Sequence, residues 1–529
     1  MGYHETYKRW QDDPEAYWLE QAKAIDWTEA PTKALFEKGE DLYEWFADAK
    51  VNGCYNAVDR HVANGRADHV AIIHDRPIPG TEAVEAMLAC ARIGAVHSVV
   101  FGGFAASELA VRINDCTPKA IIAASCGLEP NRIVAYKPLL DSAIEQSQHK
   151  PDFCLILQRE QSKCDLIEGR DLDWHAAQGG VAPADCVPVE GNHPAYILYT
   201  SGTTGAPKGV IRQTAGHLVA LNWTMKNIYD VDPGDVFWAA SDVGWVVGHS
   251  YICYGPLIHG NTTIVFEGKP VGTPDAGTFW RIISEHNVRS FFTAPTAIRA
   301  VKREDPKGEE IGKYDISCLR ALYLAGERAD PDTVVWAQNK LGKPVYDHWW
   351  QTETGYTIAG NPAGLEALPV KLGSPTVPMP GYDVQILDEA GHRQSPGTLG
   401  AIAIKLPLPP GTLPTLWNAE DRFRKSYLTT FPGYYETGDA GMIDEDGYLY
   451  IMARTDDVIN VAGHRLSTGA MEEILANHPD VAECAVVGVS DALKGQIPLG
   501  LVCLSKGVNR PHDVISAECA KMVREQIGP

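Results

Sequence analysis

The sequence has little that points to a membrane, an export route or nucleic acid. No apolar run reaches the roughly 18 residues of a membrane-spanning helix, and the start, MGYHETYKRW, has neither the basic head nor the apolar core of a signal peptide. Lysine and arginine (46) are outnumbered by aspartate and glutamate (68), for a net charge of −22. This charge disfavours nucleic acid and anionic membranes as partners, but still allows a local basic pocket for an anionic ligand. We therefore expect a cytoplasmic protein that binds neither nucleic acid nor membrane.

The twelve cysteines are scattered, with no CxxC pair and no spacing typical of a metal site. Such cysteines are typical of reduced thiols in a cytosol-like compartment rather than of a disulfide framework. Hydrophobic residues make up 45% of the chain and charged residues 22%, which indicates a soluble globular protein. A length of 529 residues accommodates roughly two to four ordinary domains.

The pattern of the chain changes twice. Residues 1–60 are rich in aromatic and charged residues with helical spacing in places, which predicts a helical lead-in packed on a larger body. Residues 61–455 begin with alternating β and α segments, which predict parallel strands covered by helices. Later in this region the turns come closer together and predict antiparallel β structure. Residues 456–529 predict a small α+β domain, with a helix Ala470–Asn477 that is entered through Ser467–Thr468.

The expected strands are short and apolar, and helices separate several of them. The predicted helices of the α/β region are Glu82–Ile93 and Ala106–Asn114. The predicted strands are His69–His74, Ala95–Phe101, Lys119–Ala124, Ala195–Thr200, Asp235–Ala240, Thr262–Phe266, Ser290–Phe292, Ala321–Ala325, Pro344–His348 and Ala485–Val489. This alternation favours the α/β fold class.

The loop after the predicted strand Ala195–Thr200 concentrates hydroxyls, glycines and one cation. Glycines let backbone N–H groups approach an anion, hydroxyls donate to phosphate oxygens, and Lys208 supplies a positive charge, so the loop predicts triphosphate binding. It is not a Walker A loop, because the GxxxxGK[ST] spacing is absent. Ser201 is not expected to be a hydrolase nucleophile, because no GxSxG elbow is present. The alternative is an ordinary flexible loop.

Five ordered motifs together resemble one family. Tyr199–Gly209 is similar to the phosphate loop of the adenylate-forming superfamily, whose members activate carboxylates with ATP. Four further segments resemble the AMP-forming short-chain acyl-CoA synthetases of the acetyl- and propionyl-CoA synthetase type: Asp242–Gly255, Asp347–Gly355, Tyr435–Asp446 and Ala453–Thr468. The start of the chain and the FGGF sequence at Phe101–Phe104 also match, so the resemblance covers nearly the whole chain.

The resemblance implies both a fold and a reaction. The fold would be α/β, with a large N-terminal domain of α/β sheet subdomains plus a β-barrel-like subdomain, followed by a small, incomplete α+β C-terminal domain on a hinge. A family member joins a carboxylate to ATP, which gives an acyl-adenylate and pyrophosphate. The thiol of coenzyme A then attacks the adenylate and AMP leaves. By resemblance this chain is a ligase that uses ATP, Mg²⁺, coenzyme A and a short-chain carboxylate.

The resemblance also assigns the nucleotide site. Lys208, Thr352 and Glu353 would be catalytic, and Glu353 would hold Mg²⁺ against the ATP phosphates, which suits a carboxylate. Without the other motifs, Glu353 would be interpreted as an ordinary solvent-exposed acidic residue in a loop. Asp439 would accept the ribose hydroxyls, and two arginines would contact ribose and phosphate, as the geometry of a guanidinium favours. The nucleotide-binding residues would be Thr200, Ser201, Gly202, Thr203, Thr204, Gly205, Gly326, Glu327, Arg328, Asp347, His348, Trp349, Trp350, Gln351, Thr352, Asp439, Arg454 and Arg465.

A second set of residues would serve coenzyme A and the change between half-reactions. The residues implied for coenzyme A are Glu129, Pro130, Asn131, Arg132, Ala462, Gly463 and Arg524. Asp456 resembles the residue at which the family changes domain orientation, since a polar residue in a short connector can absorb such a backbone change. Ordinary exposed loop residues would give the same pattern.

By resemblance, the pocket for the acyl group would be lined by Val246, Val247, Ala325 and Trp350. Trp350 would close the pocket and keep it short, and Ala325 stands where acetate-specific relatives carry valine. Replacing valine by alanine frees about two methyl groups, which is worth roughly 1–3 kcal/mol of discrimination for one added methylene. We therefore expect propionate to be used at least as readily as acetate.

Two departures from the family pattern are expected to matter. The family has a catalytic lysine beyond the point that aligns with Arg524–Pro529, and it has a helix and at least one strand that find no counterpart near Asp75–Pro79. That lysine would stabilise the charge that develops as the carboxylate attacks the α-phosphate. We therefore expect thioesterification of a supplied acyl-adenylate to survive better than adenylation. A missing strand would leave apolar faces exposed.

Two rival interpretations follow from the same residues. One is an adenylate-forming enzyme for a larger acid, such as an amino acid or a long-chain fatty acid, although a pocket closed by Trp350 disfavours a large substrate. The other is a truncated, catalytically impaired paralogue that binds nucleotide without efficient adenylation.

Overall fold

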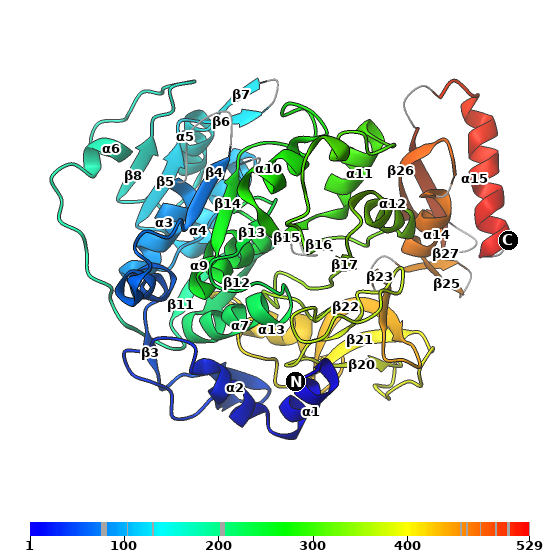
Figure 1. Ribbon diagram of the computed structural model, residues 1–529, viewed down its shortest axis with the longest axis horizontal. Coiled ribbons are helices and arrows are strands. Elements are labelled where there is room, and N and C mark those ends of the chain that lie inside the picture. The colour runs from blue at the N-terminus through cyan, green and yellow to red at the C-terminus, as the bar shows by residue number, and fades with distance from the viewer. Residues whose placement is uncertain are drawn as a thin grey trace.

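The computed structural model describes residues 1–75, 82–102, 104–129, 132–200, 207–454, 458–461, 464–476, 478–491, 495–504 and 508–527 (Figure 1). The expected gap near Asp75–Pro79 lies largely outside these residues. No helix within the described ranges is long and apolar enough to cross a membrane.

The N-terminal segment is helical only at its start. Its elements are α1 (Tyr3–Asp12), α2 (Pro14–Ala22), β1 (Leu35–Gly39), β2 (Leu42–Trp45), β3 (Lys50–Val51) and two π-helical turns at Tyr55–Asp59 and Val62–Arg66. Asp13 caps α2 by accepting from the Ala16 N–H. Trp18 is fully buried between Trp45 and Trp223, so the lead-in packs on the main body as predicted.

A six-stranded parallel sheet forms the centre of the molecule, with strand order β17-β16-β15-β13-β14-β4. Its strands are β4 (Ile72–Asp75), β13 (Val236–Ala239), β14 (Thr262–Phe266), β15 (Val288–Thr293), β16 (Ala321–Leu324) and β17 (Val345–Asp347). The predicted strand His69–His74 thus begins instead at Ile72. The parallel arrangement predicted from the sequence is confirmed.

Helices cover both faces of this sheet. Neighbouring strand residues point to opposite faces, so they pack against different sets of helices. Trp238, Phe291 and Leu322 pack with α10 (Thr278–His286), α11 (Pro295–Glu304) and α12 (Pro331–Leu341). Phe237 and Phe292 belong to the main core instead, together with α7 (Thr214–Asn227), α8 (Val246–Gly248), the π-helical segment His249–Tyr254 and α9 (Gly255–His259). Burial on both faces explains why these strands read as continuous apolar runs.

A smaller sheet lies between β4 and β13 in the chain. It contains the parallel strands β5 (Ala120–Ala124), β8 (Phe153–Leu157) and β9 (Asp171–Asp173), with α4 (Ala106–Cys116), α5 (Lys137–Gln146) and α6 (Trp174–Ala177). The helix α3 (Glu82–Arg92) packs on the main core instead. Two antiparallel pairs lie beside the smaller sheet. They are the hairpin of β6 (Cys126–Glu129) with β7 (Arg132–Ala135), and β11 (Pro194–Thr200) with β12 (Lys208–Gln213). The short β10 (Val189–Glu190) pairs with β3.

The predicted strand Ala95–Phe101 is wrong. The segment makes only an isolated bridge, in which the His97 N–H donates to Ala195 and the His97 carbonyl accepts from Ile197. Its apolar pattern suits an extended chain, but a strand also needs a partner along its length, and the described residues supply one only at His97. Ile122, on the edge strand β5, is 43% exposed.

The region predicted to be antiparallel contains a four-stranded sheet of order β20-β21-β22-β23. A β-barrel-like subdomain is expected here, and the described residues form this antiparallel sheet, in which β20 and β23 are the edge strands. Its strands are β20 (Asp383–Leu387), β21 (Gly400–Lys405), β22 (Tyr434–Ile443) and β23 (Leu449–Arg454), accompanied by α13 (Glu420–Tyr427) and the short pair β18 (Ala359–Gly360) and β19 (Val377–Pro378). Tyr3 and Tyr7 of α1 donate to the carbonyls of Pro378 and Tyr382, which ties the N-terminus to this region.

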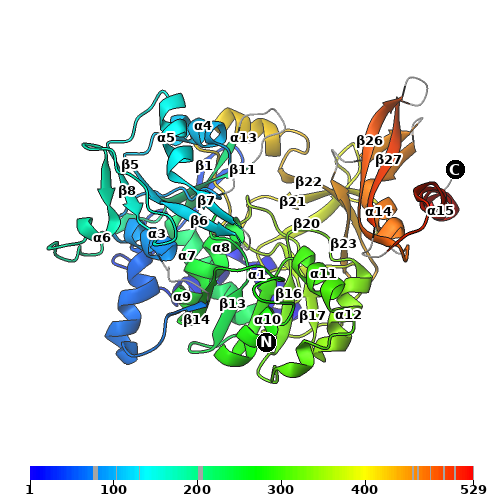
Figure 2. The ribbon, with the colours of Figure 1, turned by 90° about the horizontal axis from the view of Figure 1, so that it is seen from above.

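The C-terminal residues form an α+β unit at one end of the molecule in both views, with α15 outermost (Figure 1, Figure 2). Its sheet has the order β25-β24-β27-β26, from β24 (Val458–Val461), β25 (His464–Ser467), β26 (Val481–Asp491) and β27 (Gly495–Leu504). The helices are α14 (Thr468–Ala476) and α15 (His512–Gln526). Met471 and Leu475 of α14 pack with Ile515 and Cys519 of α15. The predicted helix and strand of this region are both present.

Candidate active site

The candidate site lies where β15, β16 and β17 end side by side. The Ala325 N–H donates to the Thr293 carbonyl over 3.2 Å, and the His348 N–H donates to the Leu324 carbonyl over 2.8 Å. Gly326 follows with a φ of +109°, a backbone angle that glycine adopts without strain. The carboxyl ends of parallel strands are where open α/β sheets bind ligands. The predicted nucleotide segments 326–328 and 347–352 therefore lie at the same edge of the sheet.

Asp439 is the centre of a polar cluster. Its Oδ2 accepts from Trp349 Nε1 over 3.2 Å and from Gln351 Nε2 over 2.8 Å, and Arg454 lies 3.6 Å from its Oδ1. The Asp439 side chain is buried, whereas Arg454 is 48% exposed. The structure thus brings together four residues that the sequence assigned to the nucleotide from three separate motifs.

Gln351 is itself held from two sides. Its Nε2 also donates to the Thr437 carbonyl over 2.7 Å, and its Oε1 accepts from the hydroxyl of Tyr435 over 3.2 Å. Both ends of the amide are therefore engaged, which orients the edge that faces Asp439.

Lys208 and Glu353, the predicted catalytic cation and metal ligand, are linked through a third residue. Lys208 Nζ donates to the hydroxyl of Tyr427 over 3.2 Å, and this hydroxyl donates to Glu353 Oε1 over 2.7 Å. Among the described residues nothing donates to Glu353 Oε2. A carboxylate with one engaged oxygen and one available oxygen suits a hard cation such as Mg²⁺.

Arg212 supports the turn that carries Glu353. Its guanidinium is fully buried and donates to the backbone carbonyls of Thr352 (2.5 Å), Glu353 (3.0 Å) and Gly411 (2.6 Å). Its Nε donates to the Tyr196 hydroxyl over 3.2 Å. A buried charge is tolerated when its hydrogen bonds are satisfied, as they are here.

Two acidic residues of the predicted nucleotide segments differ in their surroundings. Loss of solvent around Asp347 raises the pKa of its carboxyl to about 8, and its buried Oδ1 has no hydrogen-bond partner among the described residues. Glu327 instead accepts from Arg299 over 2.6 Å and from the hydroxyl of Thr296. The side chain of Glu327 is thus directed to α11.

The four predicted acyl-pocket residues share one apolar cluster. Ala325 is 6% exposed, and Val246, Val247 and Trp350 pack against the core to which it belongs. The Trp350 ring lies 5.7 Å from the Tyr251 ring and 6.3 Å from the Phe292 ring. Trp350 is therefore fixed by aromatic contacts from the η3 segment His249–Tyr254 and from β15.

The remaining predicted site residues that the structure describes are not brought together. Glu129 and Arg132 face each other in the β6–β7 hairpin, and Glu129 pairs with Lys269 over 3.3 Å. Arg524 lies on α15, which is far from this hairpin in both views (Figure 1, Figure 2). Thr200 ends β11 with a buried hydroxyl that has no partner among the described residues. Ser201, Gly202, Thr203, Thr204, Gly205, Pro130, Asn131, Asp456, Ala462, Gly463 and the side chain of Arg465 lie outside the described part of the chain.

The sequence interpretation missed Arg212, Tyr427 and Tyr435. Arg212 could have been noticed, because it directly follows the apolar residues Val210 and Ile211 in the strand Lys208–Gln213, and a charge at such a position requires buried partners. Tyr427 ends a charged helix and has no pattern that marks it.

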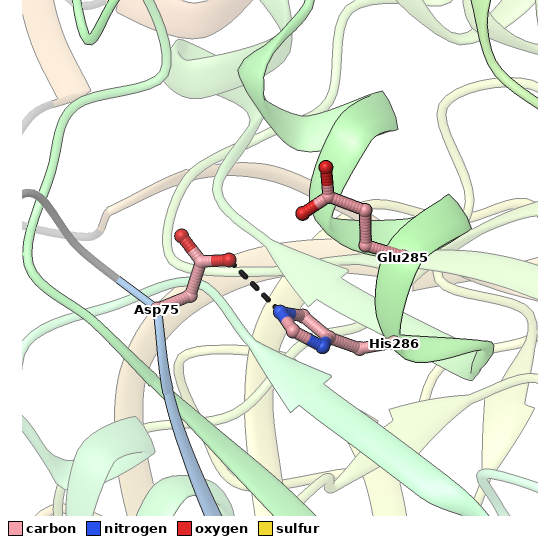
Figure 3. A group of neighbouring side chains, drawn as sticks. All are labelled: Asp75, Glu285 and His286. Atoms are coloured by element: carbon pink, nitrogen blue, oxygen red, sulfur yellow. Dashed lines mark hydrogen bonds and ion pairs between the residues drawn. The ribbon is translucent and has the colours of Figure 1, made fainter.

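Asp75, Glu285 and His286 form a group with the composition of a metal site (Figure 3). The two Asp75 oxygens, however, accept from Arg281 over 2.7 and 2.9 Å, and one also accepts from His286 over 2.9 Å. This pairing lowers the pKa of the Asp75 carboxyl, which stays ionised. The guanidinium already supplies the positive charge, so the group anchors the edge strand β4 to α10.

The chain matches known families along most of its length. A profile of AMP-binding enzymes matches residues 60–410. The acetyl-coenzyme A synthetase N-terminus matches residues 3–57, and the AMP-binding enzyme C-terminal domain matches residues 470–529. The chain belongs to the AMP-binding enzyme family. The membership predicted from the five motifs is confirmed.

Relatives of this AMP-binding enzyme align over nearly all of it. An uncharacterised protein of Pseudomonas aeruginosa is 48% identical over 567 positions, which include all of this chain and 90% of the relative. Human acyl-CoA synthetase short-chain family member 3, mitochondrial, is 48% identical over 98% of this chain and 81% of the relative. Propionate–CoA ligase of Escherichia coli is 43% identical over 95% of this chain and 86% of the relative.

The comparisons also bear on the fold and on the expected internal gap. Acetoacetyl-CoA synthetase of Streptomyces lividans superposes with a TM-score of 0.87 over 98% of this chain and 84% of that chain, at 21% identity, which confirms the α/β fold. The 567 aligned positions exceed the 529 residues of this chain by 38. The Pseudomonas relative therefore contains residues without a counterpart here, as an internal gap requires.

Proposed function

We propose that this chain is an AMP-forming acid–thiol ligase that converts a short-chain carboxylate, propionate and also acetate, to its coenzyme A thioester. The observation that carries the proposal is the convergence of Asp439, Gln351 and Arg454 with the pair Lys208 and Glu353 around the carboxyl end of the sheet. A carboxylate for ribose hydroxyls and a cation for phosphates, held on separate rigid elements, are the groups that a nucleotide triphosphate needs.

In the proposed first half-reaction the carboxylate oxygen attacks the α-phosphorus of ATP and pyrophosphate leaves. Lys208 and the loop after Thr200 would bind the phosphates, and Asp439 would fix the ribose. Glu353, with Thr352 beside it, would hold Mg²⁺, which neutralises phosphate charge and clamps the triphosphate. Trp349, Gln351 and the segments Gly326–Arg328 and Asp347–Trp350 would line the nucleoside. The site fits these groups because charged and polar atoms from distant parts of the sequence already converge there.

In the proposed second half-reaction the sulfur of coenzyme A attacks the acyl carbon, and the thiol proton passes to water. The bond between that carbon and the phosphate oxygen breaks, and AMP leaves with its electrons. Glu129–Arg132, Ala462–Gly463 and Arg524 are proposed to contact coenzyme A. Asp456 is proposed as the hinge at which the domain orientation changes between the two half-reactions. The proposed domains are residues 1–60, 61–455 and 456–529. The separation of Arg524 from the β6–β7 hairpin supports a mechanism in which the C-terminal unit moves.

The proposed substrate class rests on the residues proposed for the acyl pocket. Trp350 is fixed by two aromatic rings. Ala325, buried in the same apolar cluster, is proposed to leave room for one carbon more than acetate has. The name of the Escherichia coli relative, propionate–CoA ligase, points to the same acid. A pocket bounded by Trp350 also supports a small acid over an amino acid or a long-chain fatty acid.

Pyrophosphate exchange tests this proposal. The chain would be incubated with ATP, Mg²⁺ and labelled pyrophosphate together with propionate, acetate, a long-chain fatty acid or an amino acid. Exchange should depend on propionate or acetate, and coenzyme A should yield the matching thioester. Exchange only with a larger acid would overturn the substrate class. If exchange is absent although AMP binds in calorimetry, the impaired paralogue would be the better interpretation.

We also propose a reducing compartment, the cytoplasm in the first place. All twelve cysteines are free thiols, which suits such a compartment. The human relative carries the word mitochondrial in its name. Cell fractionation with antibody detection would decide between cytoplasm and organelle.

A further inference from the structure

We propose that the Tyr427 hydroxyl is a positioning group that keeps Lys208 and Glu353 from pairing with each other, so that the cation stays available for phosphate and the carboxylate for Mg²⁺. The proposal rests on the function proposed above and adds a residue that neither the motifs nor the comparisons assign.

The chemistry of the three groups fixes the direction of their hydrogen bonds. An ammonium group only donates and a carboxylate only accepts, whereas a phenol hydroxyl does both. Lys208 Nζ therefore donates to Tyr427 over 3.2 Å, and Tyr427 donates to Glu353 Oε1 over 2.7 Å.

The ring of Tyr427 is fixed independently of its hydroxyl. It is 6% exposed and stacks on the Tyr435 ring at a centroid distance of 5.2 Å and an interplanar angle of 13°. Phe423, one turn earlier on α13, contacts it at 5.6 Å. The Tyr435 hydroxyl bonds Gln351, which in turn bonds Asp439. The spacer is thus built into the same framework as the ribose-binding carboxylate.

Removal of the hydroxyl should change the charges rather than the fold. Lys208 and Glu353 both lie against this one oxygen, and opposite charges at such separations attract strongly when partly desolvated. In Tyr427→Phe the ring contacts remain, whereas the two charges can collapse into a direct ion pair. Each would then be withdrawn from its ligand, the phosphate or the metal.

The test measures binding rather than turnover. Calorimetry would give the dissociation constants of ATP in the presence of Mg²⁺ and of AMP without metal, for the unaltered chain and for Tyr427→Phe. We expect the Mg²⁺-ATP constant to rise about tenfold, the size typical of a hydrogen bond to a charged group. AMP binding should stay within about twofold, because AMP needs neither the metal nor the β- and γ-phosphate contacts.

Two further variants make the test specific. Tyr448→Phe removes another phenol hydroxyl, which donates to the Pro369 carbonyl, and should leave both constants unchanged. In a Glu353→Gln background the Tyr427→Phe change should lose most of its effect, since the carboxylate that would pair with Lys208 is gone.

The proposal is overturned if Tyr427→Phe leaves the Mg²⁺-ATP constant unchanged, or if it weakens AMP as much as ATP. The latter result would mean a purely structural role. Failure of the unaltered chain to bind either nucleotide would instead overturn the proposed function itself, so the two failures are distinguishable.

Discussion

The buried guanidinium of Arg212 donates to the backbone carbonyl of Glu353 over 3.0 Å. Arg212 lies on β12, which begins at Lys208, so one side chain joins the strand of the proposed phosphate-binding cation to the turn of the proposed metal ligand Glu353. The contact is made to the backbone, and it therefore sets where the turn lies without engaging the Glu353 side chain, which is the proposed metal ligand.

Arg212→Met should be among the most damaging single changes in this chain. It removes the donors of three backbone carbonyls, those of Thr352, Glu353 and Gly411. The free energy of unfolding should fall by about 3 kcal/mol or more, since buried acceptors would lose their partners. Urea titration followed by tryptophan fluorescence measures this, with Arg9→Met on the exposed surface of α1 as the matched control. Equal midpoints for the two variants would contradict the role of Arg212.

Glu353→Gln should reduce propionate-dependent pyrophosphate exchange at least about tenfold, because a neutral amide attracts Mg²⁺ less than a carboxylate does. The loss should be partly recovered at higher Mg²⁺ concentration. A defect that Mg²⁺ does not change would argue against a metal role. Glu145→Gln, at an exposed position of α5, serves as the control and should behave like the unaltered chain.

Ala325→Val should shift preference toward acetate. Two added methyl groups would enter the apolar cluster that Trp350 bounds, where Ala325 is 6% exposed. The ratio of kcat/KM for propionate to that for acetate should fall by an amount equivalent to roughly 1–3 kcal/mol. Both acids are assayed with one preparation, so a loss of folded protein cancels in the ratio. An unchanged ratio would place the end of the acyl chain elsewhere.

Asp347 should make stability depend on pH near neutrality. Loss of solvent raises the pKa of its carboxyl to about 8, above that of an unfolded chain, so the folded state holds the proton more tightly. The contribution of Asp347 to the free energy of unfolding is therefore fully present below about pH 4 and is lost as the pH rises from about 4 to 8. Asp347→Asn removes this loss.

The measurement compares urea midpoints of the unaltered chain and Asp347→Asn at pH 5 and pH 8. The free energy of unfolding of Asp347→Asn, relative to that of the unaltered chain, should be higher at pH 8 than at pH 5 by up to about 3 kcal/mol. The same shift in an exposed control, Asp332→Asn on α12, would contradict the assignment to Asp347.

Much of the fold could be predicted because the local pattern and the tertiary environment agree. The apolar segments at 262–266 and 321–324 are strands buried on both faces, where sequence pattern and burial have the same cause. Prediction failed at Ala95–Phe101, because a strand requires a partner and the partner is not encoded in the segment itself. The strand predicted at His69–His74 is found at Ile72–Asp75 for a related reason, since its pairing with β14 sets where it begins.

The sequence by itself determined the family and the parallel sheet, and it predicts the nucleotide residues, because these features are carried by contiguous motifs whose spacing follows from local backbone chemistry. Only the tertiary structure decided that Arg212 and Tyr427 belong to the site. Both act through contacts with residues far away in the chain. Arg212 and Thr352 are 140 positions apart in the sequence, and Tyr427 and Lys208 are 219 positions apart. Such contacts depend on how separate elements pack, and no local pattern specifies them.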